Sequence, residues 1–207
     1  MNQYPDSPLL QHIADDLAEQ GWSLQSVFLS AELTEALADE CRARAQAGQL
    51  AAASVGRGEG QAVREGIRGD RIQWLEPGQS PACDRYLALM DALRQELNRS
   101  LYLGLEDFEC HFALYPPGAF YQKHLDRFRD DDRRSVSAVL YLNPSWLPQQ
   151  GGALRLYLAD GSARDIAPLG GSLVVFLSGE FPHEVLPAER ERLSLTGWFR
   201  RRGDAPL

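Results

Sequence analysis

Residues 120–127 read Phe-Tyr-Gln-Lys-His-Leu-Asp-Arg and place an imidazole and a carboxylate two positions apart. Successive side chains of an extended strand alternate between its faces, so on a strand His124 and Asp126 would point the same way. Two such ligands and a distant second histidine would form the facial triad that holds ferrous iron and leaves coordination positions open. His183, in Phe-Pro-His-Glu-Val, is the candidate third ligand. Alone, a His-x-Asp pair is more often a chance or surface pair, so the surrounding sequence has to decide.

The region around this stretch, residues 108–199, is almost wholly β in character. Short apolar or alternating runs are separated by turn signals rich in Gly, Pro and Asn. The predicted strands are residues 108–115, 120–126, 135–142, 153–158, 165–167, 172–177 and 192–200. Many short strands behind a helical N-terminal layer are typical of a jelly roll or β-sandwich. The sequence therefore predicts a mainly β fold with supporting α-helices.

Residues 1 to about 100 are expected to support one sheet of this core, which spans about 105–200, within a single domain. Helical spacing of apolar residues predicts helices over 8–20, from Ser30 to Gly48, and over 81–99, with strands at 22–29 and 67–75. Residues 49–66 are rich in Ala and Gly and have little apolar pattern. Long segments of this kind are typical of mobile loops that cover a binding site, although a plain linker is the alternative.

Composition narrows the class of protein. In 207 residues, 44% are hydrophobic and 24% are charged, as in ordinary soluble globular proteins. The formal net charge of -8 gives no basic footprint for nucleic acid. No apolar run is long enough to span a membrane and the first residues do not resemble a signal peptide, so we expect a cytoplasmic protein without a membrane partner. The three cysteines have no metal-binding or disulfide spacing and are expected to be reduced.

The last predicted strand has an unusual polar face. Arg192, Ser194, Thr196 and Trp198 alternate with apolar residues, so they are expected to share the inner side of the strand. There, the Arg192 guanidinium could bind a carboxylate through two parallel hydrogen bonds. The alternative is that Arg192 only belongs to the charged run at 189–192 on the surface.

Three further side chains lie within predicted strands. Tyr115 and Tyr141 are phenols that would need polar partners if buried, as most buried tyrosines find in backbone carbonyls. His111 has no carboxylate at ligand spacing and is interpreted as structural.

Six motifs, in the same order and at closely similar spacing, resemble the prolyl hydroxylases of the hypoxia-inducible factor type. They are Ile-Arg-Gly-Asp-Arg-Ile-Gln-Trp at 67–74, Tyr-Pro-Pro-Gly at 115–118, Lys-His-Leu-Asp at 123–126, Tyr-Leu-Asn at 141–143, Gly-Gly-x-Leu-Arg at 151–155 and Pro-His-Glu-Val at 182–185, followed by Arg192 and Trp198. The resemblance runs from about residue 48 to 198, and the compact chain looks like a bacterial member of that group.

The resemblance implies a double-stranded β-helix that uses Fe(II), with 2-oxoglutarate and O2 as cosubstrates and ascorbate as an aid in vitro. His124, Asp126 and His183 would bind the iron. Arg192 would pair with the distal carboxylate of 2-oxoglutarate, and Tyr141 would hydrogen-bond to it. The other residues implied in this pocket are Tyr115, Val139, Leu154, Thr196 and Trp198.

For the substrate, the resemblance implies that residues 49–66 form a closing loop with Arg68 and Asp70 at its base. The loop sequence departs from the family, so the substrate preference does not transfer directly. The expected activity is prolyl 4-hydroxylation of a protein, with elongation factor Tu as the partner that the resemblance favours in bacteria. Two alternatives stay open: a cupin-like metal enzyme that does not use 2-oxoglutarate, and an oxygen or 2-oxoglutarate sensor without prolyl turnover.

Overall fold

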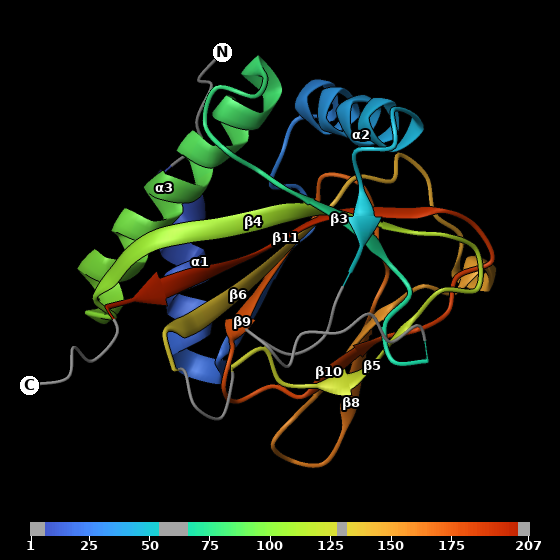
Figure 1. Cartoon of the computed structure of the whole chain (residues 1–207). Helices are drawn as coiled ribbons and strands as arrows, with labels where there is room; N and C mark the ends of the chain where they lie inside the picture. Colours follow the sequence, from blue (N-terminus) through green and yellow to red (C-terminus); the bar gives the residue numbers. More distant parts are fainter. Residues whose placement is uncertain (1–6, 54–65, 128–131, 203–207) are drawn as a thin grey trace, which may run out of the picture.

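The computed structural model describes residues 7–53, 66–127 and 132–202 (Figure 1). Its helices are α1 (Ser7–Gln20), α2 (Ala31–Gln46), α3 (Pro81–Leu101) and the short 3-10 helix η2 (Pro148–Gln150). Its strands are β1 (Trp22–Gln25), β2 (Ala51–Ala52), β3 (Arg71–Trp74), β4 (Leu105–Tyr115), β5 (Tyr121–His124), β6 (Arg134–Tyr141), β7 (Leu154–Tyr157), β8 (Ala163–Ile166), β9 (Leu173–Leu177), β10 (His183–Val185) and β11 (Arg192–Arg201). Most of the predicted loop over residues 49–66 lies outside the described residues.

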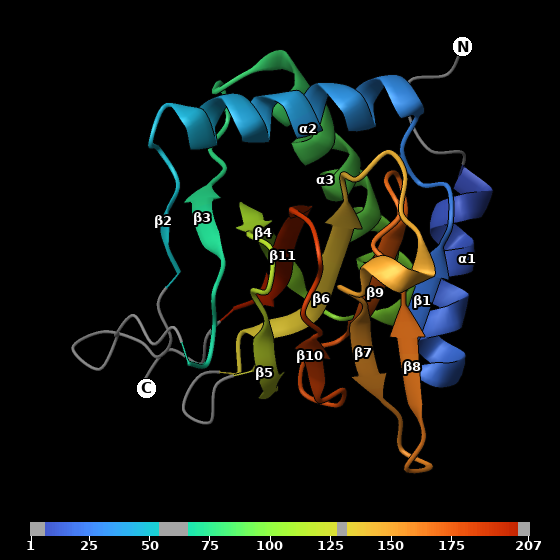
Figure 2. The same ribbon diagram turned by 90° about the vertical axis from the view of Figure 1, so that its right-hand side faces the viewer.

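The strands form two antiparallel sheets that lie as two layers (Figure 2). The larger sheet has the order β1-β9-β6-β11-β4-β3-β2, and the smaller has the order β5-β10-β7-β8. Their inward side chains share one apolar cluster, in which Val139 and Val174 of the larger sheet join Leu154 and Leu156 of the smaller. The mainly β prediction is therefore confirmed.

The helices cover the outer face of the larger sheet (Figure 1). Ile13 of α1 and Leu93 of α3 belong to the same buried cluster as Leu193 and Leu195 of β11. These two leucines alternate with the polar residues of β11, so the strand is buried on both faces: apolar toward the helices and polar toward the smaller sheet. Among the described helices, none has the length and apolar character that a membrane span requires.

Local sequence signals explain where the helices begin. The Ser30 side chain accepts a hydrogen bond from Leu33 N at the start of α2. Ser80 does the same for Cys83 N in α3, and Pro81 occupies the first turn. These caps satisfy backbone donors that a helix leaves unpaired at its start.

Two strands differ from the prediction at the site. β5 ends at His124, so Asp126 lies in the bend beyond it, and the prediction that strand alternation places this carboxylate is wrong. β10 was not predicted, because a three-residue strand is too short to show a period. β10 pairs antiparallel with both β5 and β7, and His183 lies opposite His124. The pairing of β10, rather than the alternation of β5, therefore brings the two imidazoles together.

A buried amide fixes the start of β11. Asn143 is 2% exposed and follows β6. Its Nδ2 donates to Leu193 O (3.0 Å) and Pro168 O (2.9 Å), and its Oδ1 accepts from Leu193 N (2.8 Å). Arg192 directly precedes Leu193, so this side chain also fixes the backbone that presents the guanidinium.

We therefore expect Asn143→Ala to lower the free energy of unfolding by about 2–3 kcal/mol, because it removes the hydrogen-bond partner of the buried Leu193 N and Pro168 O groups. Urea unfolding followed by circular dichroism measures this. The matched control is Gln95→Ala, which removes an exposed amide bonded to Asp91 and should cost less than about 0.5 kcal/mol. Equal midpoints for the two variants would contradict the role of Asn143.

Candidate active site

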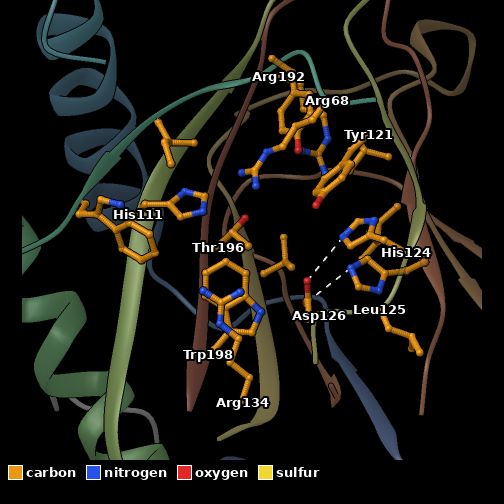
Figure 3. Close-up of a pocket in the computed structure, with 17 residues that line it drawn as sticks. Arg68, His111, Tyr121, His124, Leu125, Asp126, Arg134, Arg192, Thr196 and Trp198 are labelled. Atoms are coloured by element: carbon orange, nitrogen blue, oxygen red, sulfur yellow. Dashed lines mark ion pairs between the residues drawn. The ribbon is translucent and has the colours of Figure 1, made fainter. Parts of the chain in front are cut away.

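A cavity of about 160 Å³ lies between the two sheets (Figure 3). Its wall includes most of the side chains predicted for the site: Arg68, Tyr115, His124, Asp126, Val139, Leu154, His183, Arg192, Thr196 and Trp198. Tyr141 and Asp70 do not line it; both are buried behind the wall. The fold thus gathers residues that are up to 130 positions apart in the sequence around one space.

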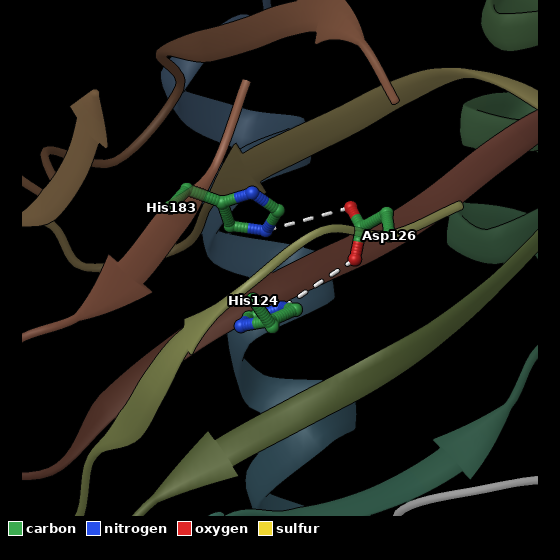
Figure 4. A group of neighbouring side chains, drawn as sticks. All are labelled: His124, Asp126 and His183. Atoms are coloured by element: carbon green, nitrogen blue, oxygen red, sulfur yellow. Dashed lines mark ion pairs between the residues drawn. The ribbon is translucent and has the colours of Figure 1, made fainter. Parts of the chain in front are cut away.

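His124, Asp126 and His183 converge at one side of this cavity (Figure 4). Their ligand atoms all lie within 4.8 Å of one another. Asp126 Oδ1 is 3.5 Å from His124 Nε2, and Asp126 Oδ2 is 3.5 Å from His183 Nε2. These separations are longer than good hydrogen bonds. The three groups face a common point without satisfying one another, as the ligands of a metal ion do.

The protonation of the imidazoles suits metal binding. His124 Nδ1 lies 2.7 Å from Gln122 O, and His183 Nδ1 lies 3.0 Å from Phe181 O. A carbonyl only accepts, so in the neutral imidazole each Nδ1 holds the proton and each Nε2 presents its lone pair to the cavity. Burial lowers the pKa of His183, which favours the neutral, ligating form.

The carboxylate between them is held in its charged form. Burial by itself would raise the pKa of Asp126, but the positive charge that His183 and His124 carry when protonated, together with hydrogen bonds from His124 and the Ser137 hydroxyl, lowers it well below the usual range. Two imidazoles and one carboxylate fit the 2-His-1-carboxylate set that non-haem ferrous iron takes. These three residues would hold such an ion.

The other end of the cavity holds a buried positive charge. Arg192 is 1% exposed and forms no ion pair with any described residue. Its Nε donates to Gly152 O at 2.9 Å, while Nη1 lies 3.5 Å from Ser194 Oγ, which is long for a hydrogen bond. A guanidinium stays charged in proteins, and burying it without a partner is costly. An anionic ligand with a carboxylate would satisfy it.

Two phenols flank this guanidinium. The Arg192 Cζ atom lies 5.0 Å from the ring centroid of Tyr115 and 5.1 Å from that of Tyr141. The Tyr141 hydroxyl is buried and has no hydrogen-bond partner among the residues that the structure describes. Burial raises the pKa of Tyr141 to about 12, although Arg192 offsets part of this, so the phenol keeps its proton. It is a neutral donor beside a cation, which again suits a carboxylate.

The two residues predicted to bind substrate behave differently from each other. Arg68 lines the cavity, whereas Asp70 is 2% exposed and bonds to the Arg68 guanidinium through both oxygens, at 2.6 and 2.8 Å. Arg68 in turn lies over the ring of Tyr121 (4.8 Å), which stacks on His124 at 3.6 Å. Asp70 therefore orients Arg68 from behind, and Arg68 packs the wall next to the metal ligand.

An aromatic wall at the cavity mouth was not predicted from the sequence. Trp74 packs edge-on against His111 (5.1 Å between ring centroids), and His111 lies 5.6 Å from Trp198. Burial lowers the pKa of His111 to about 4, so it is neutral at physiological pH. Alternation along β4 puts His111 on the same face as Tyr115. That signal was available in the sequence.

Known proteins with similar sequences and structures identify the family of this chain. Residues 110–200 match the model of the 2OG-Fe(II) oxygenase superfamily. The human protein Egl nine homolog 1 is 31% identical over 92% of this chain. The chain spans 46% of that relative's length. A prolyl hydroxylase from Trichoplax adhaerens, solved in complex with a hypoxia inducible factor oxygen degradation domain peptide fragment, is 29% identical, with a TM-score of 0.83 over 93% of this chain and 89% of that one.

The crystal structure of a Pseudomonas putida prolyl-4-hydroxylase is 64% identical, with a TM-score of 0.85. The match covers 94% of this chain and 100% of that one. It confirms the double-stranded β-helix that the motif resemblance implied, with the same superfamily found independently over the β core. The chain belongs to the 2OG-Fe(II) oxygenase superfamily, in the branch that contains the prolyl hydroxylases.

Proposed function

We propose that this protein is an Fe(II)- and 2-oxoglutarate-dependent prolyl 4-hydroxylase that acts on a proline of a protein. The observation that supports this most directly is the pair of unsatisfied charges in one cavity. A carboxylate between two imidazoles faces a cation site, and the buried Arg192, which has no ion pair with a described residue, faces an anion site. The 64% identity with a prolyl-4-hydroxylase supports the choice of reaction.

Each part of the cavity has a distinct task in this reaction. When bound, the iron and 2-oxoglutarate would reduce O2, insert one oxygen atom into a C–H bond and release succinate and carbon dioxide. His124, Asp126 and His183 would hold the ion and would leave coordination positions for the cosubstrates. Arg192 would hold the far carboxylate of the keto acid, which fixes its orientation, while Tyr141 packs behind that guanidinium.

The cavity mouth suits a peptide chain. Trp74 and Leu125 both line it and are 43% and 45% exposed. Exposed apolar side chains beside a buried reaction centre offer a surface for an extended segment, with one ring inserted. Arg134 stacks over Trp198 at 3.6 Å within this wall, and Glu109 binds its guanidinium at 2.9 Å, so Arg134 holds the Trp198 ring in place. The bacterial resemblance makes elongation factor Tu, a cytoplasmic protein, the first substrate to test.

The buried arginine argues against a cupin-like enzyme without 2-oxoglutarate, because such an enzyme would have no use for a guanidinium held unpaired in the core. A sensor without turnover would keep the same cavity and differs only in the fate of a bound peptide. Product analysis therefore separates it from the proposed hydroxylase.

Arg192→Ala should leave metal affinity intact and weaken 2-oxoglutarate binding at least about 100-fold, because a buried charge partner is worth about 3 kcal/mol or more. Anaerobic titration of the Fe(II) protein with 2-oxoglutarate measures this through the visible band of the chelated keto acid. Arg155→Ala is the matched control, since Arg155 pairs with Asp165 away from the cavity. Unchanged 2-oxoglutarate binding in Arg192→Ala would rule out its role.

Loss of a group that only supports a metal ligand lowers metal affinity about 10- to 100-fold. His183→Ala should lower it by more than this, because it removes a direct ligand. Competition between Mn(II) and a chromogenic chelator measures the affinity. His12→Ala, which removes an exposed histidine outside the site, should bind metal as the unmodified protein does. Retained affinity in His183→Ala would show that the third ligand is a different residue.

The substrate can be found in a lysate of a bacterium that encodes the protein. After incubation with the purified enzyme, Fe(II), ascorbate and 2-oxoglutarate, mass spectrometry should detect one added oxygen on a proline, first in elongation factor Tu. The Arg192→Ala protein provides the blank. Absence of any oxidised proline, with iron and 2-oxoglutarate shown to bind, would favour the sensor.

A further inference from the structure

The strands of the sheet do not fix the orientation of the Asp126 carboxylate. The other two residues of the triad, His124 and His183, lie on strands. Asp126 lies beyond the end of β5, in a bend that also includes Arg127. No ladder hydrogen bonds of β5 therefore orient it. Its two oxygens each lie 3.5 Å from one imidazole Nε2, so they face the metal position equally (Figure 4).

Two serines make the surroundings of the two Asp126 carboxylate oxygens different. Ser137, on the inner face of β6, places its Oγ 2.7 Å from Asp126 Oδ2. Ser178, in the turn after β9, places its Oγ 2.8 Å from Ser137 Oγ. Both serines are 0% exposed. Neither hydroxyl has an alternative in solvent. Ser137 belongs to the larger sheet and Ser178 directly follows one of its strands, whereas the two imidazoles belong to the smaller sheet.

The direction of these hydrogen bonds follows from the chemistry of the groups. An ionised carboxylate only accepts, so Ser137 gives its single hydroxyl proton to Asp126 Oδ2. The Ser137 oxygen is then free to accept, and Ser178 donates to it. The bond to Oδ2 is charge-assisted and short, whereas no hydroxyl of a described residue binds Oδ1. Oδ1 is thus the oxygen with its lone pairs available.

We propose that Ser178 and Ser137 form a two-hydroxyl relay that positions Asp126 to bind iron through Oδ1 alone. The inference rests on the metal centre of the proposed function and assigns two positioning residues to it. With Oδ2 held by Ser137, the carboxylate takes one coordination position. If it were released, both oxygens could chelate the ion and compete with the keto acid for a position.

The test compares the unmodified protein with Ser137→Ala, Ser178→Ala and a control. Ser23→Ala is closely matched, because Ser23 is also 0% exposed, lies in the same sheet and donates to a carboxylate, Asp16 Oδ2, at 2.7 Å. Two readouts need no turnover: Mn(II) affinity, from the electron paramagnetic resonance of the free ion, and the visible band of anaerobic Fe(II) protein with 2-oxoglutarate. Thermal unfolding identifies any variant that fails to fold.

Ser137→Ala should lose about 10- to 100-fold in Mn(II) affinity and, even at saturating iron, require more 2-oxoglutarate to develop the band. Ser178→Ala should change both readouts in the same direction by less, because Ser137 still reaches Asp126. Ser23→Ala should change neither. If Ser137→Ala does not fold, Ser178→Ala decides alone.

Two results have different meanings. Normal metal and 2-oxoglutarate binding by the folded serine variants, with the unmodified protein binding both, would overturn the relay and leave the proposed function standing. Failure of the unmodified protein to bind either ligand would instead overturn the proposed function, and the relay with it.

Discussion

The antiparallel pairing of β10 with β5 is the contact on which the candidate site depends. It sets His183 opposite His124, with their ring centroids 4.3 Å apart. β10 has only three residues and also pairs with β7, so its position is fixed from both sides. Two imidazoles held this closely, each with Nδ1 turned to a backbone carbonyl, leave little freedom for their Nε2 atoms. The rest of the cavity is arranged around that point.

The cavity is also defined by charges that the protein does not neutralise itself. Among the described residues, Asp126 faces two imidazoles and the Ser137 hydroxyl, and Arg192 faces phenols and a backbone carbonyl. A folded chain could lower its free energy by pairing these two groups directly, yet they occupy separate ends of the space (Figure 3). Keeping them apart reserves a place for a cation at one end and a carboxylate at the other, which is what iron and 2-oxoglutarate supply.

Support for these groups comes from the layer beneath them. Asn143 fixes the backbone beside Arg192, and Asp70 fixes Arg68 through two hydrogen bonds. Both are nearly fully buried, and neither lines the cavity. The helices α1 and α3 bury the reverse face of β11, so the strand that presents Arg192 and Thr196 is packed on both sides. Such packing holds side chains in the narrow range of positions that ligand binding requires.

The amino-acid sequence by itself determined the mainly β class, the helix starts at Ser30 and Pro81, the three candidate ligands and the arginine on the polar face of β11. These follow from alternation, capping and motif spacing, which are local or depend on order along the chain. Only the tertiary structure decided that Asp126 lies off its strand, that β10 exists, that Asp70 and Tyr141 lie behind the cavity, and that Ser137 reaches Asp126. Those features arise from contacts between strands that are distant in the sequence, and local periodicity contains no information about which strands meet.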